Sequence, residues 1–335
     1  MRPGDRVKIG RRRLSFLLVT SAIVPAVVFA QTKQLPARIA LVINAMRGSD
    51  SNARVEAFAQ GMSELGYVEG RDYVLDLRHA EGRLDHLPML ISDALRARPD
   101  VLVISGSQAA WAAKKATSTV PVVLATVADP VGQGLITSLA RPGGNLTGFA
   151  ILSDVVLVKS VELARELLPQ ASSLGYLVNP ETPIFPILWK HFETAAVRLG
   201  FKPLRFEATN AEELDRALAY VVRERPGGLV VAQNALFVTG RKKIAEFALR
   251  NKIVALHPTS DAVVAGGLIS YAADLTDPFR KSAAVVHRIL KGAKPAELPV
   301  EQATRLELYV NLKTAQALGL TIPKSVLLRA DRVIQ

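Results

Sequence analysis

Short runs of Val, Ile and Leu recur along this chain, and segments with a helical spacing of apolar residues separate them. In the first half the strand-like runs lie at 38–43, 73–77, 98–105 and 120–125. The segments with helical spacing predict helices at 52–65, 85–98, 108–116 and 131–140. Because parallel strands need helical crossovers, this alternation predicts a parallel sheet with helices on both faces.

The same strand and helix plan is repeated in the second half. Leu65-Gly66-Tyr67 and Leu199-Gly200-Phe201 mark equivalent points, with the two glycines 134 positions apart. Further strand-like runs lie at 175–179, 225–232 and 251–257, and helices are predicted at 186–199, 211–225 and 241–251. A doubled plan of this kind predicts two similar lobes, with a cleft between them that can enclose a ligand.

A glycine-rich segment and the C-terminal tail set the predicted domain boundaries. Residues 141–148 contain three glycines and one proline, a composition that favours a hinge. The tail predicts strands at 266–271 and 306–310 and helices at 277–291 and 312–318, joined by a connection at 294–300. We expect this tail to return to lobe one and cross again. Lobe one is therefore assigned 37–147 and about 272–303, and lobe two 148–271 and about 304–335.

The first 30 residues have the order of a signal peptide. A basic segment ends at Arg13, an apolar run covers 14–29, and Ala30 supplies a small residue for cleavage. A membrane anchor is the alternative, but Pro25 and several hydroxyl residues interrupt a run that is short for a bilayer span. We expect cleavage near Ala30 and a protein that is soluble in the periplasm, while the general secretory and twin-arginine export routes both stay open.

Composition and charge narrow the class of protein further. Hydrophobic residues make up 49% of the chain and charged residues 21%, which is typical of globular domains. Of the net charge of +12, five units lie in the first 30 residues and the rest is scattered, which favours a solvated surface over a nucleic-acid face. The chain has no cysteine, which excludes disulfides, thiolate metal sites and cysteine-linked lipids.

In parallel sheets, ligands bind at the carboxyl ends of the strands. Most side chains at these ends are uncharged hydrogen-bonding groups, which suit a small polar or zwitterionic solute. The candidate ligand-binding residues are Asn44, Ser105, Ser107, Gln108, Thr126, Asp129, Asn179, Asn234, Thr259 and Tyr271. A zwitterion would place its carboxylate near Ser107 and its ammonium near Asp129. Two structural alternatives stay open: Ser107 as a helix cap and Asp129 as a turn residue.

The sequence contains no recognisable catalytic constellation. Its five histidines lie far apart, and only His257 follows a strand on the predicted cleft side. Phosphate-binding loops, a dinucleotide fingerprint and a nucleophile elbow are all missing from the sequence. We therefore expect a binding protein that needs no cofactor or metal. A secreted enzyme with a dispersed active site and a ligand-sensing module for a membrane receptor are the alternatives.

Three segments resemble one known family. Residues 65–70, 129–148 and 311–323, together with 328–331, are similar to the ABC-transporter substrate-binding proteins that include tryptophan- and tyrosine-type uptake receptors. The resemblance implies the type I periplasmic-binding-protein fold, with two Rossmann-like lobes of parallel sheets joined by a multi-stranded hinge. It also implies a receptor that delivers a small-molecule, amino-acid-like solute to a membrane permease and ATPase. We expect this receptor to be a monomer.

Overall fold

A computed structural model of the 335-residue chain describes residues 35–44 and 47–335. The predicted signal peptide lies outside these residues, so cleavage near Ala30 stays a prediction. Residues 36–335 form one unit that is built on two sheets. None of its described helices is long and apolar enough to cross a membrane.

The first sheet has the strand order β11-β5-β4-β3-β1-β2, and all its neighbouring strands are parallel. Its strands are β1 (Ala37–Ile43), β2 (Tyr73–His79), β3 (Val101–Ser105), β4 (Val122–Ala128), β5 (Leu146–Ile151) and β11 (Glu301–Ala303). Strand β1 shows why the strand-like runs in the sequence contain consecutive apolar residues. Ile39 and Leu41 are buried on one face while Ala40 and Val42 are buried on the other. Both faces of this sheet are therefore covered, as parallel sheets require.

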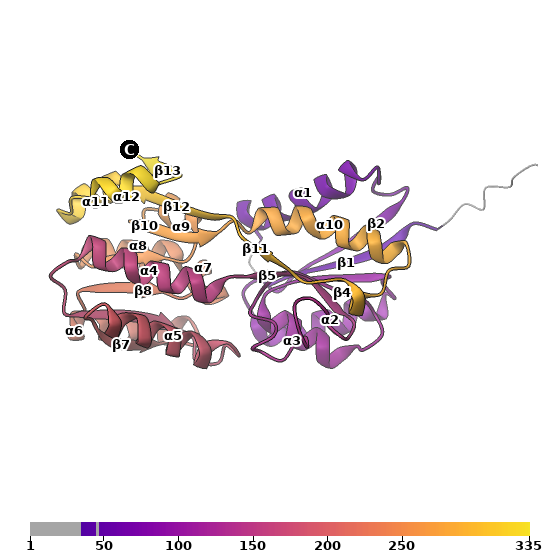
Figure 1. Ribbon diagram of the computed structural model, residues 1–335, viewed down its shortest axis with the longest axis horizontal. Helices are drawn as coiled ribbons and strands as arrows, with labels where there is room; N and C mark the ends of the chain where they lie inside the picture. Colours follow the sequence, from indigo (N-terminus) through magenta and orange to yellow (C-terminus); the bar gives the residue numbers. More distant parts are fainter. Residues whose placement is uncertain (1–34, 45–46) are drawn as a thin grey trace, which may run out of the picture. The chain divides into compact units, whose positions relative to one another are not determined.

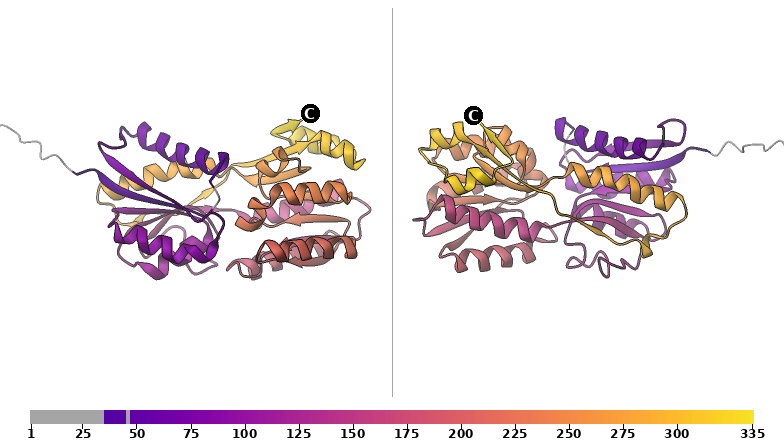
Figure 2. Two further views of the ribbon diagram at one scale, coloured as in Figure 1. Left: turned by 180° about the vertical axis from the view of Figure 1, so that it is seen from behind. Right: turned by 45° about the horizontal axis from the view of Figure 1, so that its top comes forward.

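Two pairs of helices cover the first sheet. The pair on one face is α1 (Ser49–Glu64) and α10 (Thr276–Leu290), which lie side by side although they are far apart in the sequence (Figures 1 and 2). The opposite face carries α2 (Leu87–Arg96), which follows a single 3-10 turn (Leu84–His86), and α3 (Ser107–Ala116). The late helix α10 thus completes a layer that the N-terminal part of the chain begins.

The second sheet has the order β13-β12-β10-β9-β8-β6-β7, and only the β10–β12 pair is antiparallel. Its strands are β6 (Ser173–Val178), β7 (Lys202–Glu207), β8 (Gly228–Val231), β9 (Val254–His257), β10 (Ile269–Ala273), β12 (Leu306–Asn311) and β13 (Arg332–Ile334). One face is covered by α4 (Ser153–Leu167), α5 (Phe185–Arg198), α11 (Leu312–Leu318) and α12 (Lys324–Arg329). The other face is covered by α6 (Ala211–Glu224), α7 (Ala235–Thr239) and α8 (Arg241–Arg250).

The chain passes between the two sheets three times. It leaves the first sheet between β5 and α4, returns between β10 and α10, and leaves again between β11 and β12. The helix α9 (Ser260–Val264) and a 3-10 turn (Pro295–Glu297) lie in the remaining connections. Strand β5 runs across the predicted boundary at 147/148, and β10 runs across the one at 271/272. As limits of domains, the predicted boundaries remain a proposal.

Two predictions from local sequence are wrong. Residues 131–140 form turns and not a helix: Leu135 and Ile136 both donate their backbone N–H to the Pro130 carbonyl, at 2.8 and 3.1 Å. These two side chains are nevertheless buried, which explains the apolar pattern of the segment. The glycine-rich segment 141–148 is no hinge between the sheets, because it leads into β5 of the first sheet. The Asn145 amide holds it there, donating to the Thr117 and Val120 carbonyls.

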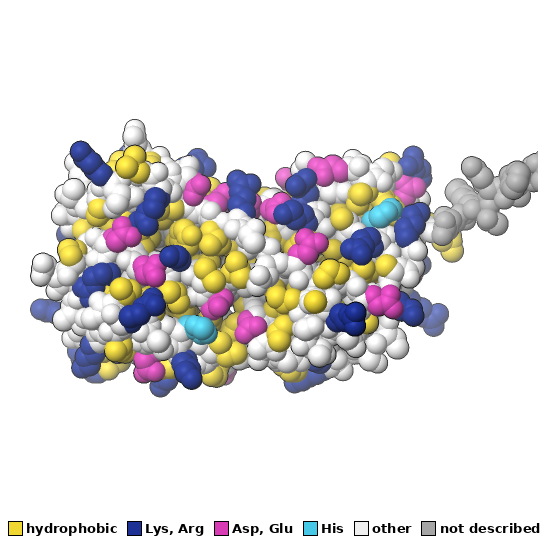
Figure 3. Space-filling view, viewed as in Figure 1, with side chains coloured by type: hydrophobic (Ala, Val, Ile, Leu, Met, Phe, Trp, Pro, Cys, Tyr) yellow, Lys and Arg dark blue, Asp and Glu magenta, His cyan; other side chains and the backbone are white. Residues whose placement is uncertain are grey.

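Basic side chains are dispersed on the surface. On the face shown in Figure 3, Lys and Arg are interspersed with Asp and Glu. Elsewhere in the described chain, as in the pairs Arg329–Glu166 and Lys281–Asp277, basic side chains form ion pairs with acidic ones. Such exposed pairs contribute little to stability. This face has the mixed, solvated character that the scattered charge of the sequence predicts.

Candidate functional site

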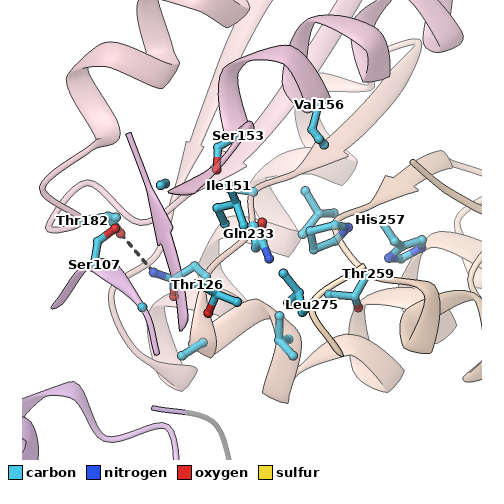
Figure 4. Close-up of a pocket in the computed structure, with 18 of the residues that line it drawn as sticks. Ser107, Thr126, Ile151, Ser153, Val156, Thr182, Gln233, His257, Thr259 and Leu275 are labelled. Atoms are coloured by element: carbon cyan, nitrogen blue, oxygen red, sulfur yellow. Dashed lines mark hydrogen bonds between the residues drawn. The ribbon is translucent and has the colours of Figure 1, made fainter. Parts of the chain in front are cut away.

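A cavity lies where carboxyl ends of strands from both sheets come together (Figure 4). The first sheet contributes the ends of β1, β3 and β4, and the second contributes the ends of β8 and β9. The cavity volume is about 180 Å³, which is well above the roughly 15 Å³ that a single water molecule needs, so the cavity has room for a small organic solute. This position is where parallel sheets bind ligands.

Most of the predicted ligand-binding residues line this cavity. They are Asn44, Ser105, Ser107, Gln108, Thr126, Asn234, Thr259 and Tyr271. Two predicted residues, Asn179 and Asp129, are not among its lining residues. The Asn179 side chain is buried, and its Oδ1 accepts the backbone N–H of Glu181 at 2.9 Å, which stabilises the turn after β6. Sequence reasoning thus placed the strand ends well, although contact with a ligand is still a proposal.

The start of α3 forms one polar part of the cavity. Gly106 precedes the helix with a φ of 94°, and a Cβ at this position would lie 2.3 Å from the Nδ2 atom of Asn44. Glycine therefore lets the Asn44 amide approach the first turn of the helix. The Oγ atoms of Ser105 and Thr126 share a hydrogen bond of 2.9 Å. The first backbone N–H groups of a helix have no partner within the helix, and they favour an anion.

Ser107 keeps a proton available for a ligand. Its Oγ accepts a hydrogen bond from Gln133 Nε2 at 3.0 Å, and the same Nε2 also donates to the Ala128 carbonyl. Ser107 Oγ donates to none of the residues that the structure describes. Gln133 thus holds the Ser107 oxygen in position by donating to it, while the O–H of Ser107 can still donate into the cavity. A hydroxyl held in this way can donate to a hydrogen-bond acceptor in the cavity.

The second sheet contributes a matching set of uncharged groups. Asn234 caps α7 through Oδ1, which accepts the Leu236 N–H at 2.9 Å, and its Nδ2 donates to Thr182 Oγ1 at 3.0 Å. Thr182 and Gln233 also line the cavity (Figure 4). Thr259, at the end of β9, is buried, and its hydroxyl has no hydrogen-bond partner among the described residues. Hydroxyl and amide groups on this side can donate or accept as a solute requires.

Asp129 has a structural role in this geometry. Its backbone φ is 30°, and its Oδ1 accepts the Gly132 backbone N–H at 2.8 Å. This is the turn alternative that the sequence left open. The carboxylate stabilises the turn after β4, and the lining of the cavity gives no support to a pairing with a ligand ammonium.

Sequence reasoning missed the apolar and cationic parts of the cavity. The apolar part comes from α4, α5 and the faces of β6, β8 and β9, whose residues read as ordinary core in the sequence. The cationic part consists of Arg47, Arg54 and Arg241, from the loop after β1, from α1 and from α8. Arginines that line a cavity raise the local concentration of anions. In the described part of the chain, no group of His, Asp and Glu side chains is arranged to hold a metal ion.

His257 lines the cavity as a buried, neutral side chain. Burial lowers the pKa of His257 to about 4, from 6.5 for an exposed histidine, and its Nε2 has no partner among the described residues. Gly267 packs against the ring, since a Cβ there would lie 2.7 Å from Nε2. The imidazole is therefore uncharged at neutral pH.

This burial predicts a loss of stability in acid. Between pH 6.5 and 4 the unfolded chain binds a proton at His257 that the folded chain does not, so stability should fall as the pH falls, by roughly 3 kcal/mol in all. Urea unfolding at several pH values should show a shallower decline in His257→Asn than in the native protein. The partly exposed His191 offers a control, since His191→Asn should keep the native decline. Equal slopes in all three proteins would exclude this role of His257.

Comparisons with known proteins agree with this architecture. Residues 39–334 match the model of a family described as ABC transporter substrate binding protein. A tyrosine-binding protein of Clostridioides difficile is 24% identical over 266 residues, which are 79% of this chain and 76% of that protein. A conserved domain protein of Vibrio cholerae has a TM-score of 0.83 and 27% identity, over 89% of this chain and 99% of that one.

A third relative was solved with a ligand. It is an ABC domain of Streptococcus pneumoniae in complex with L-Trp, with a TM-score of 0.81 and 25% identity, over 88% of this chain and 100% of that one. These likenesses confirm the predicted α/β fold of the type I periplasmic binding proteins.

Proposed function

Because this chain belongs to the ABC transporter substrate-binding protein family, we propose that it is an exported receptor for a small amino-acid-like solute, which it hands to a permease and ATPase. One observation carries the proposal: uncharged strand-end side chains from both sheets line a single cavity. Relatives support the class of solute, since one is named for tyrosine and another was solved with L-Trp. The signal-like N-terminus supports export to the periplasm.

The first sheet supplies the proposed site for the carboxylate of the solute. The first turn of α3 offers backbone N–H groups, and Ser107 offers its O–H at the same place. Arg54 of α1 also lines the cavity and adds positive charge. Binding here needs no chemical step, because a receptor only has to hold and release its solute. The uncharged amide and hydroxyl groups of the second sheet would then meet the other polar groups of the solute.

A thermal-shift screen tests the proposal. Amino acids, aromatic acids, nucleobases and sugars should be added separately to the mature protein, and we expect amino acids or related carboxylates to raise its melting temperature. A solute at a hundred times its Kd stabilises the folded state by about 2.7 kcal/mol. Sugars or nucleobases as the only stabilising compounds would contradict the proposed solute class. Conversion of a solute during the assay would support a secreted enzyme instead.

Two substitutions separate the anchors that the sequence suggested. Ser107→Ala removes a hydrogen bond to a charged group and should weaken binding of a stabilising amino acid about tenfold to a hundredfold. Asp129→Asn should leave the affinity within about twofold, because Asp129 holds a turn outside the lining of the cavity. Calorimetry on both variants measures the difference. A strong loss of affinity in Asp129→Asn, with an unchanged melting temperature, would restore the pairing of Asp129 with an ammonium.

A further inference from the structure

The inner end of the cavity is an apolar chamber on one face of the second sheet. We define this inner chamber by Leu157, Tyr176, Ile184, Leu188, Val230 and Leu256, all of which line the cavity. Strand pairing sets Tyr176 opposite Val230, and Val230 opposite Leu256. These three side chains form a floor across β6, β8 and β9, and helices α4 and α5 supply the walls. The chamber therefore offers an apolar surface that continues from the polar strand ends.

Tyr176 places one polar atom in this apolar chamber. Its side chain is 2% exposed, and its hydroxyl makes no hydrogen bond with any residue that the structure describes. Burial raises the pKa of Tyr176, so the hydroxyl stays protonated and can either donate or accept. Ser160 also lines the cavity, and its hydroxyl donates to the Val156 carbonyl at 2.8 Å. Buried hydroxyl groups normally have partners, and Tyr176 shares the lack of one with Thr259, which lines the same cavity.

The ring of Tyr176 is held rigidly. It stacks on Phe192 with a centroid distance of 4.7 Å and an interplanar angle of 23°, and Phe192 in turn contacts Trp189 at 5.7 Å. Phe192 and Trp189 both belong to α5, which packs on this face of the sheet. The position of the Tyr176 hydroxyl is thus fixed by the core and not by a polar partner. A polar group held in this way can discriminate between solutes that differ by one hydrogen-bonding group.

We infer that the apolar body of the solute enters the inner chamber and that a hydrogen-bonding group at its far end pairs with the Tyr176 hydroxyl. The inference rests on the proposed function, because it takes the carboxylate of the same solute to lie near the start of α3. A solute with this layout has a charged head, a flat apolar body and a polar tip. A hydroxylated aromatic amino acid has all three, whereas its unhydroxylated counterpart lacks the tip. Tyr176 is then the residue that selects between them.

Calorimetry with L-tyrosine and L-phenylalanine tests this inference. The native protein should bind L-tyrosine about tenfold to a hundredfold more tightly, the range expected for one buried hydrogen bond. Tyr176→Phe should bind L-phenylalanine as the native protein does and lose its preference for L-tyrosine. Tyr220 lies on α6, outside the cavity, and Tyr220→Phe should keep the native preference. The Tyr176→Phe variant keeps the ring that stacks on Phe192, so its melting temperature without solute should not be lower.

The outcomes separate this inference from the proposed function. Equal affinities of the native protein for the two amino acids, or a preference that survives in Tyr176→Phe, would overturn the role of Tyr176 and leave the receptor intact. If a carboxylate solute stabilised the protein while neither L-tyrosine nor L-phenylalanine bound, the role of Tyr176 would again be overturned and the receptor function would stand. A native protein that no compound in the screen stabilises would overturn both.

Discussion

Gly148→Ala should lower the free energy of unfolding by about 3 kcal/mol or more, from backbone strain and a backbone clash together. Gly148 lies within β5 at a φ of 127°, a conformation that side-chain-bearing residues rarely adopt. A Cβ there would lie 2.3 Å from the Leu124 carbonyl oxygen and 2.7 Å from the Leu124 nitrogen. The pairing of β4 with β5 is irregular between Leu124 and Val127, so the glycine accommodates a bulge.

A control for this substitution lies four residues away. At Gly144 a Cβ would meet no atom within 4 Å, and the residue is not at a positive φ. Gly144→Ala should therefore change stability by less than about 0.5 kcal/mol, as is usual for surface sites. Urea unfolding of both variants measures the difference. Similar small losses in the two would show that the β4–β5 irregularity relaxes at little cost.

Arg165→Ala should destabilise the protein by about 2–4 kcal/mol, through lost hydrogen bonds and a lost cation–π contact. Arg165, near the end of α4, donates through Nε to the Leu199 carbonyl at 2.9 Å. Its Nη1 donates to the carbonyls of three residues after the helix, Leu168, Pro169 and Ala171. The guanidinium carbon also lies 3.6 Å from the centroid of the Phe201 ring. One side chain thus joins the end of α4 to the α5–β7 turn.

Two further variants show whether geometry or charge is responsible. Arg165→Lys keeps the charge but not the planar fork of donors, so it should recover only part of the lost stability. Arg198→Ala removes an exposed arginine that pairs with Glu162 at 3.5 Å, and should cost less than about 1 kcal/mol. Chemical denaturation of all three variants measures these losses. A full recovery in Arg165→Lys would show that charge alone matters at this position.

The sequence predicted the fold class because repeated buried strands and amphipathic helices leave a strong local pattern. The predicted helix at 312–318 has the bounds of α11. The sequence could not show whether the glycine-rich segment 141–148 is a hinge or contains a strand bulge, because glycine occurs in both. At Gly148 the deciding contact is with Leu124, which is distant in sequence. The sequence analysis also predicted no helix at the position of α4 (Ser153–Leu167), which begins soon after this glycine.

The polar half of the candidate site could also be predicted, since strand ends follow from the alternation of elements. The apolar half could not. Tyr176 and Val230 alternate with residues buried on the opposite face, and the sequence of a buried strand is the same whether it faces a helix or a cavity. Asp129 is the opposite case, a residue that was predicted at the site but lies outside the lining of the cavity. Its place after β4 resembled that of a ligand contact, but only the bond to the Gly132 N–H identifies a turn.

The three passages between the sheets have a consequence for folding during synthesis. The first sheet lacks β11 until residues 301–303 are made, and the second lacks β12 and β13 until residues 306–334 follow. Contacts between such distant segments close slowly, because a long loop must be ordered before they form. Neither sheet can therefore gain its full set of strands early on the ribosome. A chain interrupted before residue 301 would leave β5 and β10 without the neighbours β11 and β12 that cover them in the complete protein, and newly exposed strand edges are prone to aggregation.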